Sequence, residues 1–219
     1  VILGGYVETE YVNDFHGASH FDQHRLVIFI YARPHERVSF ATEVEWEHGG
    51  TPRKANGELI AGESLLEFAV LDFKVANWLN VRGGIVLVPM GGYNITHDSP
   101  TQDLTTRPMV ATYIAPSTWF ETGAGFFGDI PIGKHQLSYE LYAINGLDSK
   151  VYDDLGFRAA RGSLGEDNNG SKALTGRLAW DPLMGLRIAG SGYRGAYDPA
   201  SKRFVSMAAL DVTARYKFL

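Results

Sequence analysis

Ten strand-like stretches in this chain are joined by connections that alternate between long and short, and this alternation constrains the fold more than any other feature. The long connections are rich in Gly, Asn, Asp and Pro, whereas the others are tight turns. A membrane-spanning up-and-down barrel has short turns on one side of the bilayer and longer loops on the other. The pattern therefore predicts an all-β, antiparallel, up-and-down transmembrane β-barrel. The predicted strands comprise residues 2–12, 20–33, 37–48, 61–74, 79–88, 119–129, 135–146, 171–181, 185–197 and 203–218.

Composition permits such a barrel and excludes membrane-spanning helices. The longest apolar runs, residues 26–32 and 85–90, are much shorter than the roughly 18 residues that a transmembrane helix needs. A barrel strand alternates apolar and polar residues, so its average hydropathy stays near that of a soluble protein. The net charge of −5 provides no basic surface, and we expect no nucleic-acid partner.

The third predicted strand shows two faces most clearly. Apolar side chains such as Val44 and Trp46 alternate there with Glu43, Glu45 and Glu47, and a period of two places the sets on opposite faces. A charged side chain on the lipid side would cost up to about 3 kcal/mol, so the three carboxylates should face water. A soluble sheet with one solvated face gives the same alternation, but strands of about 10 to 14 residues are twice the usual globular length.

Other predicted strands also place charged side chains on the inward face. Their signs are mixed, and we expect a lumen lined in this way to contain water. The further charged residues predicted to line it include Arg82, Arg177, Arg187, Asp211 and Arg215.

The longest connection, residues 89–118, follows a strand in which Gly83 and Gly84 indicate a bend or a close backbone approach. A connection of this length usually has a function. In a barrel we expect it to fold inward and narrow the pore, where its charged groups meet passing solutes. We predict a transverse field between this loop and the wall. The loop contributes Asp98, Asp103 and Arg107, with His97 beside them, and the facing wall contributes Glu43, Glu45, Arg82 and Arg177.

Six motifs point to a known family. They occupy residues 21–25 (FDQHR), 45–49 (EWEHG), 88–97 (VPMGGYNITH), 103–108 (DLTTRP), 116–125 (PSTWFETGAG) and 138–147 (SYELYAINGL). Together they resemble a group of Gram-negative outer-membrane porins that is similar to the phosphate-selective porin O and P family. The resemblance covers nearly the whole chain, and residues 85–147 are its most specific part. It implies a 16-stranded barrel, trimers in many relatives and a third outer loop that enters the pore.

Two features depart from that family. About ten of the sixteen strands are visible, and residues 217–219 do not match the terminal Phe of such proteins. We therefore expect residues 1–219 to be an outer-membrane barrel that is incomplete at its C-terminal end; the alternative is a ten-stranded barrel in which the first and last strands pair. Phosphate selectivity in the namesakes rests on inward Arg and Lys ladders. The mixed charges of this lumen do not reproduce them, and the phosphate specificity is not transferred.

The sequence thus predicts a porin of the Gram-negative outer membrane, a water-filled channel through which small hydrophilic solutes or ions diffuse passively. Its expected partners are outer-membrane lipid, those solutes and, by the resemblance, two further copies in a homo-trimer. The alternative is a structural barrel or sleeve that holds a lipoprotein or an electron-transfer cytochrome. We expect no enzyme, because His97, Asp98 and Ser99 are adjacent and cannot form a catalytic triad by themselves.

A histidine series near the first long connection has the residue types of a metal site. His16, His20 and His24 are spaced by four, and Asp22 shares their parity. Residues at an outer loop and upper wall are more often ordinary polar lining. The sequence-based prediction is therefore that the chain holds no metal and no cofactor.

Overall fold

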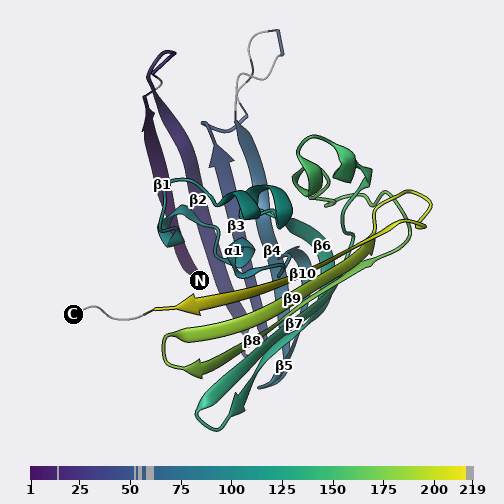
Figure 1. The fold of residues 1–219 in the computed structure, drawn as a ribbon. Helices are drawn as coiled ribbons and strands as arrows, with labels where there is room; N and C mark the ends of the chain where they lie inside the picture. Colours follow the sequence, from purple (N-terminus) through teal and green to yellow (C-terminus); the bar gives the residue numbers. More distant parts are fainter. Residues whose placement is uncertain (14, 52, 54–55, 58–61, 216–219) are drawn as a thin grey trace.

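The computed structural model describes residues 1–13, 15–51, 53, 56–57 and 62–215. Predicted strand residues 61 and 216–218 lie outside these ranges. Ten antiparallel strands form one sheet in chain order (Figure 1), which confirms the predicted up-and-down topology. β1 and β10 are the edges of this sheet, and no pairing between described residues joins them, so the sheet is open here. The strands are β1 (Ile2–Val12), β2 (His20–His35), β3 (Val38–Glu47), β4 (Glu63–Ala76), β5 (Leu79–Leu87), β6 (Phe120–Ile132), β7 (His135–Ile144), β8 (Ala173–Leu183), β9 (Leu186–Ala196) and β10 (Phe204–Ala214).

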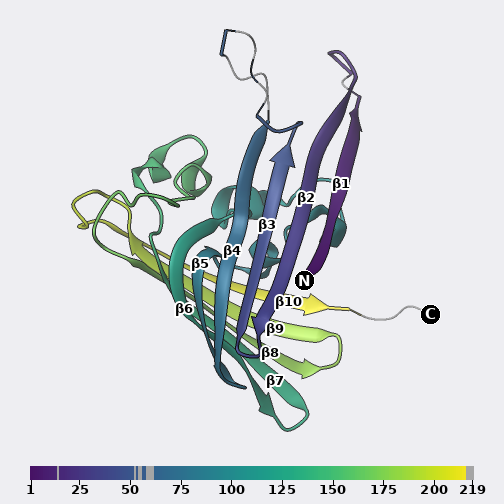
Figure 2. The same ribbon diagram turned by 180° about the vertical axis from the view of Figure 1, so that it is seen from behind.

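The four short connections are all two-residue hairpin turns. They consist of residues 36–37, 77–78, 133–134 and 184–185. Gly133 and Gly185 have φ of 61° and 83°, in the left-handed region that tight hairpin turns require. Because neighbouring strands are antiparallel, these turns all lie at one end of the strands, and the long connections lie at the other end (Figures 1 and 2).

Strand registers assign each side chain to one of two faces, which we name the inner and outer face. Glu43 pairs with Phe29 and is on the inner face, whereas Val44 pairs with Ile28 on the outer face. The outer face is mostly apolar, with a few Ser and Thr residues such as Thr42, Ser64 and Thr122. Within the described strands it carries one Asp, Glu, Lys or Arg, namely Arg194 near the end of β9. Large side chains of the outer face include Leu3, Val7, Leu26, Leu66, Leu71, Phe126, Leu141, Leu174, Leu178, Leu210 and Val212.

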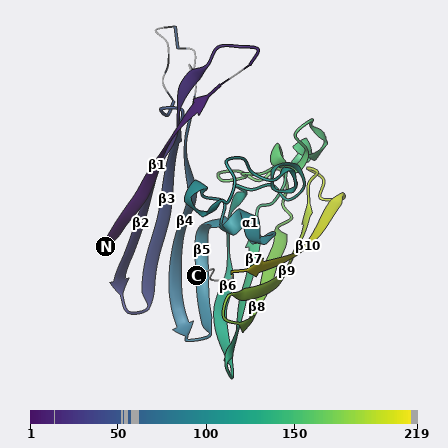
Figure 3. The same cartoon turned by 60° about the vertical axis from the view of Figure 1, so that its left-hand side comes forward.

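The sheet is strongly curved, and the two longest connections lie within the curve. Figure 3 shows β1–β4 and β8–β10 as two wings on either side of the helical segments. No helix formed by the described residues is long and apolar enough to cross a membrane. The short helical segments are α1 (Gly92–Ile95), η1 (Ser99–Thr101) and η2 (Val110–Ile114) between β5 and β6, and η3 (Ser149–Tyr152) and η4 (Gly156–Arg158) between β7 and β8.

Gly84 occupies a close backbone approach in β5. Its φ is +129°, and a Cβ atom there would lie 2.1 Å from the carbonyl oxygen of Ala69. Its partner on β6 is Gly123, so neighbouring strands both lack side chains at this point of the inner face. Missing side chains let the sheet bend where β5 and β6 pass under the long connection.

The centre of the inner face is dry, which differs from the wet lining expected from the sequence. Two connections cover this part of the sheet and bury its apolar side chains. The resulting cluster is a hydrophobic core like that of a soluble protein, and water has no access to it. Its members include Val86, Val88, Met90, Trp119, Tyr142, Ile144, Leu147 and Tyr193.

Candidate functional site

The β5–β6 connection crosses the inner face from β9 to β1. At its start the backbone N–H of Gly91 donates to Ser191 Oγ on β9 at 2.8 Å. Further along, Ser99 Oγ donates to Glu8 Oε2 on β1 at 2.6 Å. The connection is therefore attached to strands at both sides of the sheet, which fixes it as a strap across the inner face.

Asn94 closes the base of this strap. Its side-chain Nδ2 donates to the carbonyl oxygens of Val88 and Trp119, both at 2.8 Å, and its Oδ1 accepts from the N–H of Trp119 at 2.9 Å. Asn94 is buried, so these backbone groups have no water to replace it. One side chain thus joins the two ends of the connection.

The β7–β8 connection is fastened to the strap. Arg161 donates to the carbonyl oxygen of Ser117 at 2.8 Å and also contacts Thr118. Buried Glu121 of β6 accepts from the N–H groups of Gly162 and Ser163 at 3.0 and 2.9 Å. These contacts hold two arginine-bearing segments over the carboxylate-rich strands.

A groove remains open between the strap and strands β1–β3. Its volume is about 450 Å³, and it continues into a smaller pocket of about 70 Å³ against β3 and β4. Carboxylates of the strands lie on one side, where Arg25 of β2 pairs with Glu8, Glu45 and Glu47. Arginines of the two connections lie on the other side. We call this the charged groove. Its carboxylates are Glu8, Glu10, Glu45, Glu47, Glu63 and Glu67, and its arginines from the connections are Arg107, Arg158 and Arg161.

The three arginines repel one another. Burial, followed by the charges of Arg158 and Arg107, lowers the pKa of Arg161 to about 10. Burial and Arg107 also lower the pKa of Arg158. Arg161 stays positively charged at neutral pH, because a pKa of about 10 is still well above it. Opposing signs therefore face each other across the charged groove.

Four of the predicted wall residues lie in ion pairs within the wall. Each of three arginines makes a bidentate contact with a carboxylate, so its charge is largely neutralised there. The carboxylate is on the adjacent strand for Arg82 and Arg187, and on the next strand but one for Arg177. Arg82 and Arg177 were predicted to face the loop charges across the constriction, and in the structure both are engaged with carboxylates of the wall. The pairs are Arg82 with Asp72 at 2.7 and 2.8 Å, Arg177 with Asp211 at 2.6 Å for both contacts, and Arg187 with Asp181 at 2.8 Å for both.

The loop residues of the prediction separate. Asp98 accepts from the hydroxyl of Tyr6 at 3.1 Å and lies on the acidic side, whereas Arg107 lines the charged groove. Asp103 is exposed, as is Arg215 at the end of β10. Of the predicted site residues, the groove brings together only Glu45, Glu47 and Arg107. His97 and Glu43 are buried beside it.

Several groove residues were not predicted, and Glu67 shows why. A β-bulge between β3 and β4 pairs Glu43 with Phe68 and Val44 with Leu66, which leaves Glu67 without a partner in the register. Strict alternation counted back from inward Asp72 would turn Glu67 to the outer face. A bulge shifts the phase by one residue, and no residue pattern in β4 marks it.

No protein-family model matches the chain. An uncharacterized protein of Aquifex aeolicus is 32% identical over 201 residues, a match that covers 88% of this chain and 44% of that protein. The chain thus spans less than half the length of this relative. The crystal structure of Pseudomonas aeruginosa OccK8 (OprE) aligns with a TM-score of 0.26 and 12% identity, over 88% of this chain and 66% of that chain. A similarity of this degree is too low to transfer a function.

Proposed function

We propose that this chain forms part of the wall and the constriction of an outer-membrane porin. Its outer face contacts lipid, and the charged groove is part of the path for small hydrophilic solutes or ions. The observation that carries the proposal is the division of one ten-stranded sheet into an apolar outer face and an inner face that bears its charges. In water such an outer face would be a large aggregation-prone surface. In lipid it is the expected exterior.

Strand lengths support this location. A membrane-crossing β-strand needs about 9–11 residues, and the strands here contain 9 to 16. Leu210 and Leu3 of the outer face are 78% and 71% exposed. Burying such side chains in acyl chains stabilises by about 25 cal/mol per Å².

The open edges require a further part of the proposal. Backbone N–H and C=O groups at the free sides of β1 and β10 cannot remain unpaired in lipid, where each costs several kcal/mol. We therefore propose that additional strands of the full-length protein close the barrel, and that this barrel resides in the outer membrane of a Gram-negative bacterium.

The charged groove supports ion sorting. Carboxylates of β3 and β4 oppose Arg107 and Arg158 across a water-accessible gap, so a passing ion experiences a transverse field. Glu47 and Arg107 line both parts of the groove, whereas Glu43 is buried beneath it. Selectivity should therefore depend on Glu47 more than on Glu43.

Reversal potentials across planar bilayers in a KCl gradient test the proposal on the full-length protein. Replacing Glu47 and Glu63 by Gln should raise the anion-to-cation permeability ratio, and replacing Arg107 and Arg158 by Gln should lower it. Lys134→Gln is the control, because Lys134 lies in a two-residue turn at the opposite end of the strands. It should leave the permeability ratio unchanged.

Two outcomes would contradict the proposal. Equal permeability ratios in all variants would remove the charged groove from the ion path. Absence of conductance, together with a partner protein that co-purifies in fixed ratio, would favour the sleeve instead.

A further inference from the structure

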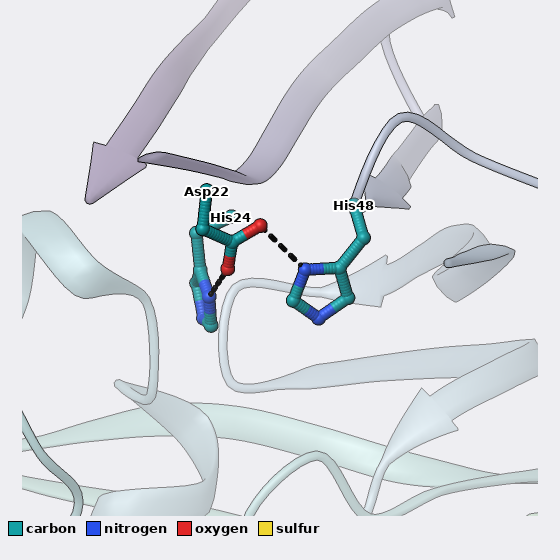
Figure 4. A group of neighbouring side chains, drawn as sticks. All are labelled: Asp22, His24 and His48. Carbon is teal, nitrogen blue, oxygen red and sulfur yellow. Dashed lines mark hydrogen bonds and ion pairs between the residues drawn. The ribbon is translucent and has the colours of Figure 1, made fainter. Parts of the chain in front are cut away.

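A second cluster of polar side chains lies at the end of the strands that carries the long connections. Asp22 and His24 belong to β2, and His48 follows β3 directly. Figure 4 shows both imidazole rings directed at the carboxylate of Asp22. Nδ1 of His48 is 2.8 Å from Asp22 Oδ1, and Nδ1 of His24 is 3.4 Å from Asp22 Oδ2. One ligand atom from each of the three residues lies within 4.8 Å of the others.

A β-bulge in β2 builds this cluster. Glu8 pairs with Arg25 and Glu10 with Asp22, so Thr9 of β1 faces both Gln23 and His24. The additional residue keeps Asp22 and Arg25 on the same inner face and turns His24 between them.

His48 is fixed by its own backbone. Its N–H donates to the carbonyl oxygen of His24 at 3.2 Å, which extends the β2–β3 pairing by one residue. Its φ of 48° is left-handed, a conformation in which His is enriched among non-glycine residues. The three side chains are therefore placed by strand pairing before any ligand arrives.

We propose that Asp22, His24 and His48 form a binding site for a divalent transition metal such as Zn²⁺. Two imidazole nitrogens and one carboxylate oxygen are a ligand set that zinc uses with an open fourth position. Zinc–ligand bonds of about 2.1 Å in a tetrahedron place ligand atoms about 3.4 Å apart. Nδ1 of His48 and Nδ1 of His24 lie 2.8 and 3.4 Å from different oxygens of Asp22, and one ligand atom of each residue lies within 4.8 Å of the other two. Small side-chain shifts therefore suffice to reach the tetrahedral spacing.

The surroundings suit an exchangeable cation. The side chains of Asp22, His24 and His48 are 19%, 27% and 41% exposed, so an ion can enter from solvent. Glu10 Oε2 is 3.9 Å from His24 Nδ1, so a further carboxylate adds negative charge beside the three ligands.

Arg25 must change partner when metal binds. Its Nη2 donates to His24 Nε2 at 2.9 Å, which requires that Nε2 carry no proton. A metal on Nδ1 favours the tautomer with the proton on Nε2, so this hydrogen bond is given up. Glu8 and Glu47 already lie 3.1 and 3.2 Å from the same guanidinium. Their carboxylates can accept the N–H that no longer donates to His24.

Sequence spacing alone pointed to a different set, His16, His20 and His24. The structure replaces the first two by His48, which is distant in sequence and adjacent through the β2–β3 pairing. The site is independent of the proposed channel function, because it requires only the local strand register.

Zinc titration of the full-length, detergent-purified protein tests the site, with calorimetry for affinity and Co²⁺ absorption for coordination geometry. The protein should bind one Zn²⁺ that excess Ca²⁺ does not displace, since Ca²⁺ prefers oxygen ligands. His48→Gln and His24→Gln should each weaken binding about 100-fold. His48 is exposed and pairs with His24 through its backbone N–H, so replacing its side chain removes no hydrogen bond of the strand pairing.

His135→Gln is the matched control, because His135 is exposed at the opposite end of the strands beside Trp180. It should leave zinc affinity unchanged. Undiminished binding in His48→Gln, an equal loss in His135→Gln, or no zinc binding by the unmodified protein would each overturn the assignment. A Co²⁺ spectrum of a six-coordinate ion that His24→Gln does not alter would do the same.

Discussion

Nε2 of His97 lies 2.6 Å from Oε2 of Glu67, and both side chains are almost completely buried. The other ring nitrogen, Nδ1, donates to the carbonyl oxygen of Asn94 at 2.7 Å. A proton must therefore lie between Nε2 and the carboxylate. This contact joins β4 to the strap and places the acidic side of the charged groove against it.

Removing His97 should release the strap. His97→Ala leaves Glu67 buried without its partner, and we expect a loss of about 3–5 kcal/mol in the free energy of unfolding. Urea titration in detergent measures this loss, and limited proteolysis should cut residues 89–118 faster. Asp103→Ala, on the same connection but exposed, should change stability by less than about 0.5 kcal/mol. Equal stabilities of the two variants would show that the contact does not hold the strap.

Gly84 should not tolerate a methyl group. Its φ of +129° and the 2.1 Å approach of Ala69 O force the backbone to move, so Gly84→Ala should destabilise by about 3 kcal/mol. Its neighbour provides the matched control: a Cβ on Gly83 would first meet Ala124 Cβ at 3.9 Å, and Gly83→Ala should be nearly neutral. Melting temperatures and the folded fraction on gels of unheated samples report both. A neutral Gly84→Ala would refute the close approach.

Charge on the outer face should be costly in lipid. With the outer face in lipid, as proposed, Leu210→Arg would place a guanidinium among acyl chains and should cost about 2–4 kcal/mol near the bilayer centre. Thr213→Arg adds the same side chain to the exposed inner face of the same strand, and its cost should be small. Unfolding free energies measured in lipid vesicles compare the two. Equal costs, or a protein that stays in solution without detergent, would exclude a lipid-facing outer surface.

Strand positions were predictable because their signals are local. The predicted and observed first strands agree, at residues 2–12 and Ile2–Val12, and the other nine differ by a few residues at their ends. Turn residues and alternation of apolar with polar side chains act over neighbouring positions, so they are visible in one sequence. The inward orientation of Glu43, Glu45 and Glu47 follows from the same alternation.

Ion pairs of the wall were less predictable. Arg177 reaches Asp211 of β10 across β9, whose intervening residues Ala189 and Ser191 are small. The sequence alone does not show that Arg177 and Asp211 lie on either side of one strand, nor that the small residues of that strand leave room for their contact. Side-chain partners depend on registers between strands, and a register is a property of the assembled sheet.

The sequence by itself determined ten strands, their antiparallel order and the apolar and polar faces, since each follows from periodicity and turn chemistry along the chain. Only the tertiary structure decided the bulges that aim Glu67 and His24, the dry centre beneath two connections, and the meeting of Arg158 and Arg161 with the carboxylates of β3 and β4. A one-residue shift in pairing reverses every following side chain, and its energy comes from contacts between segments far apart in the sequence.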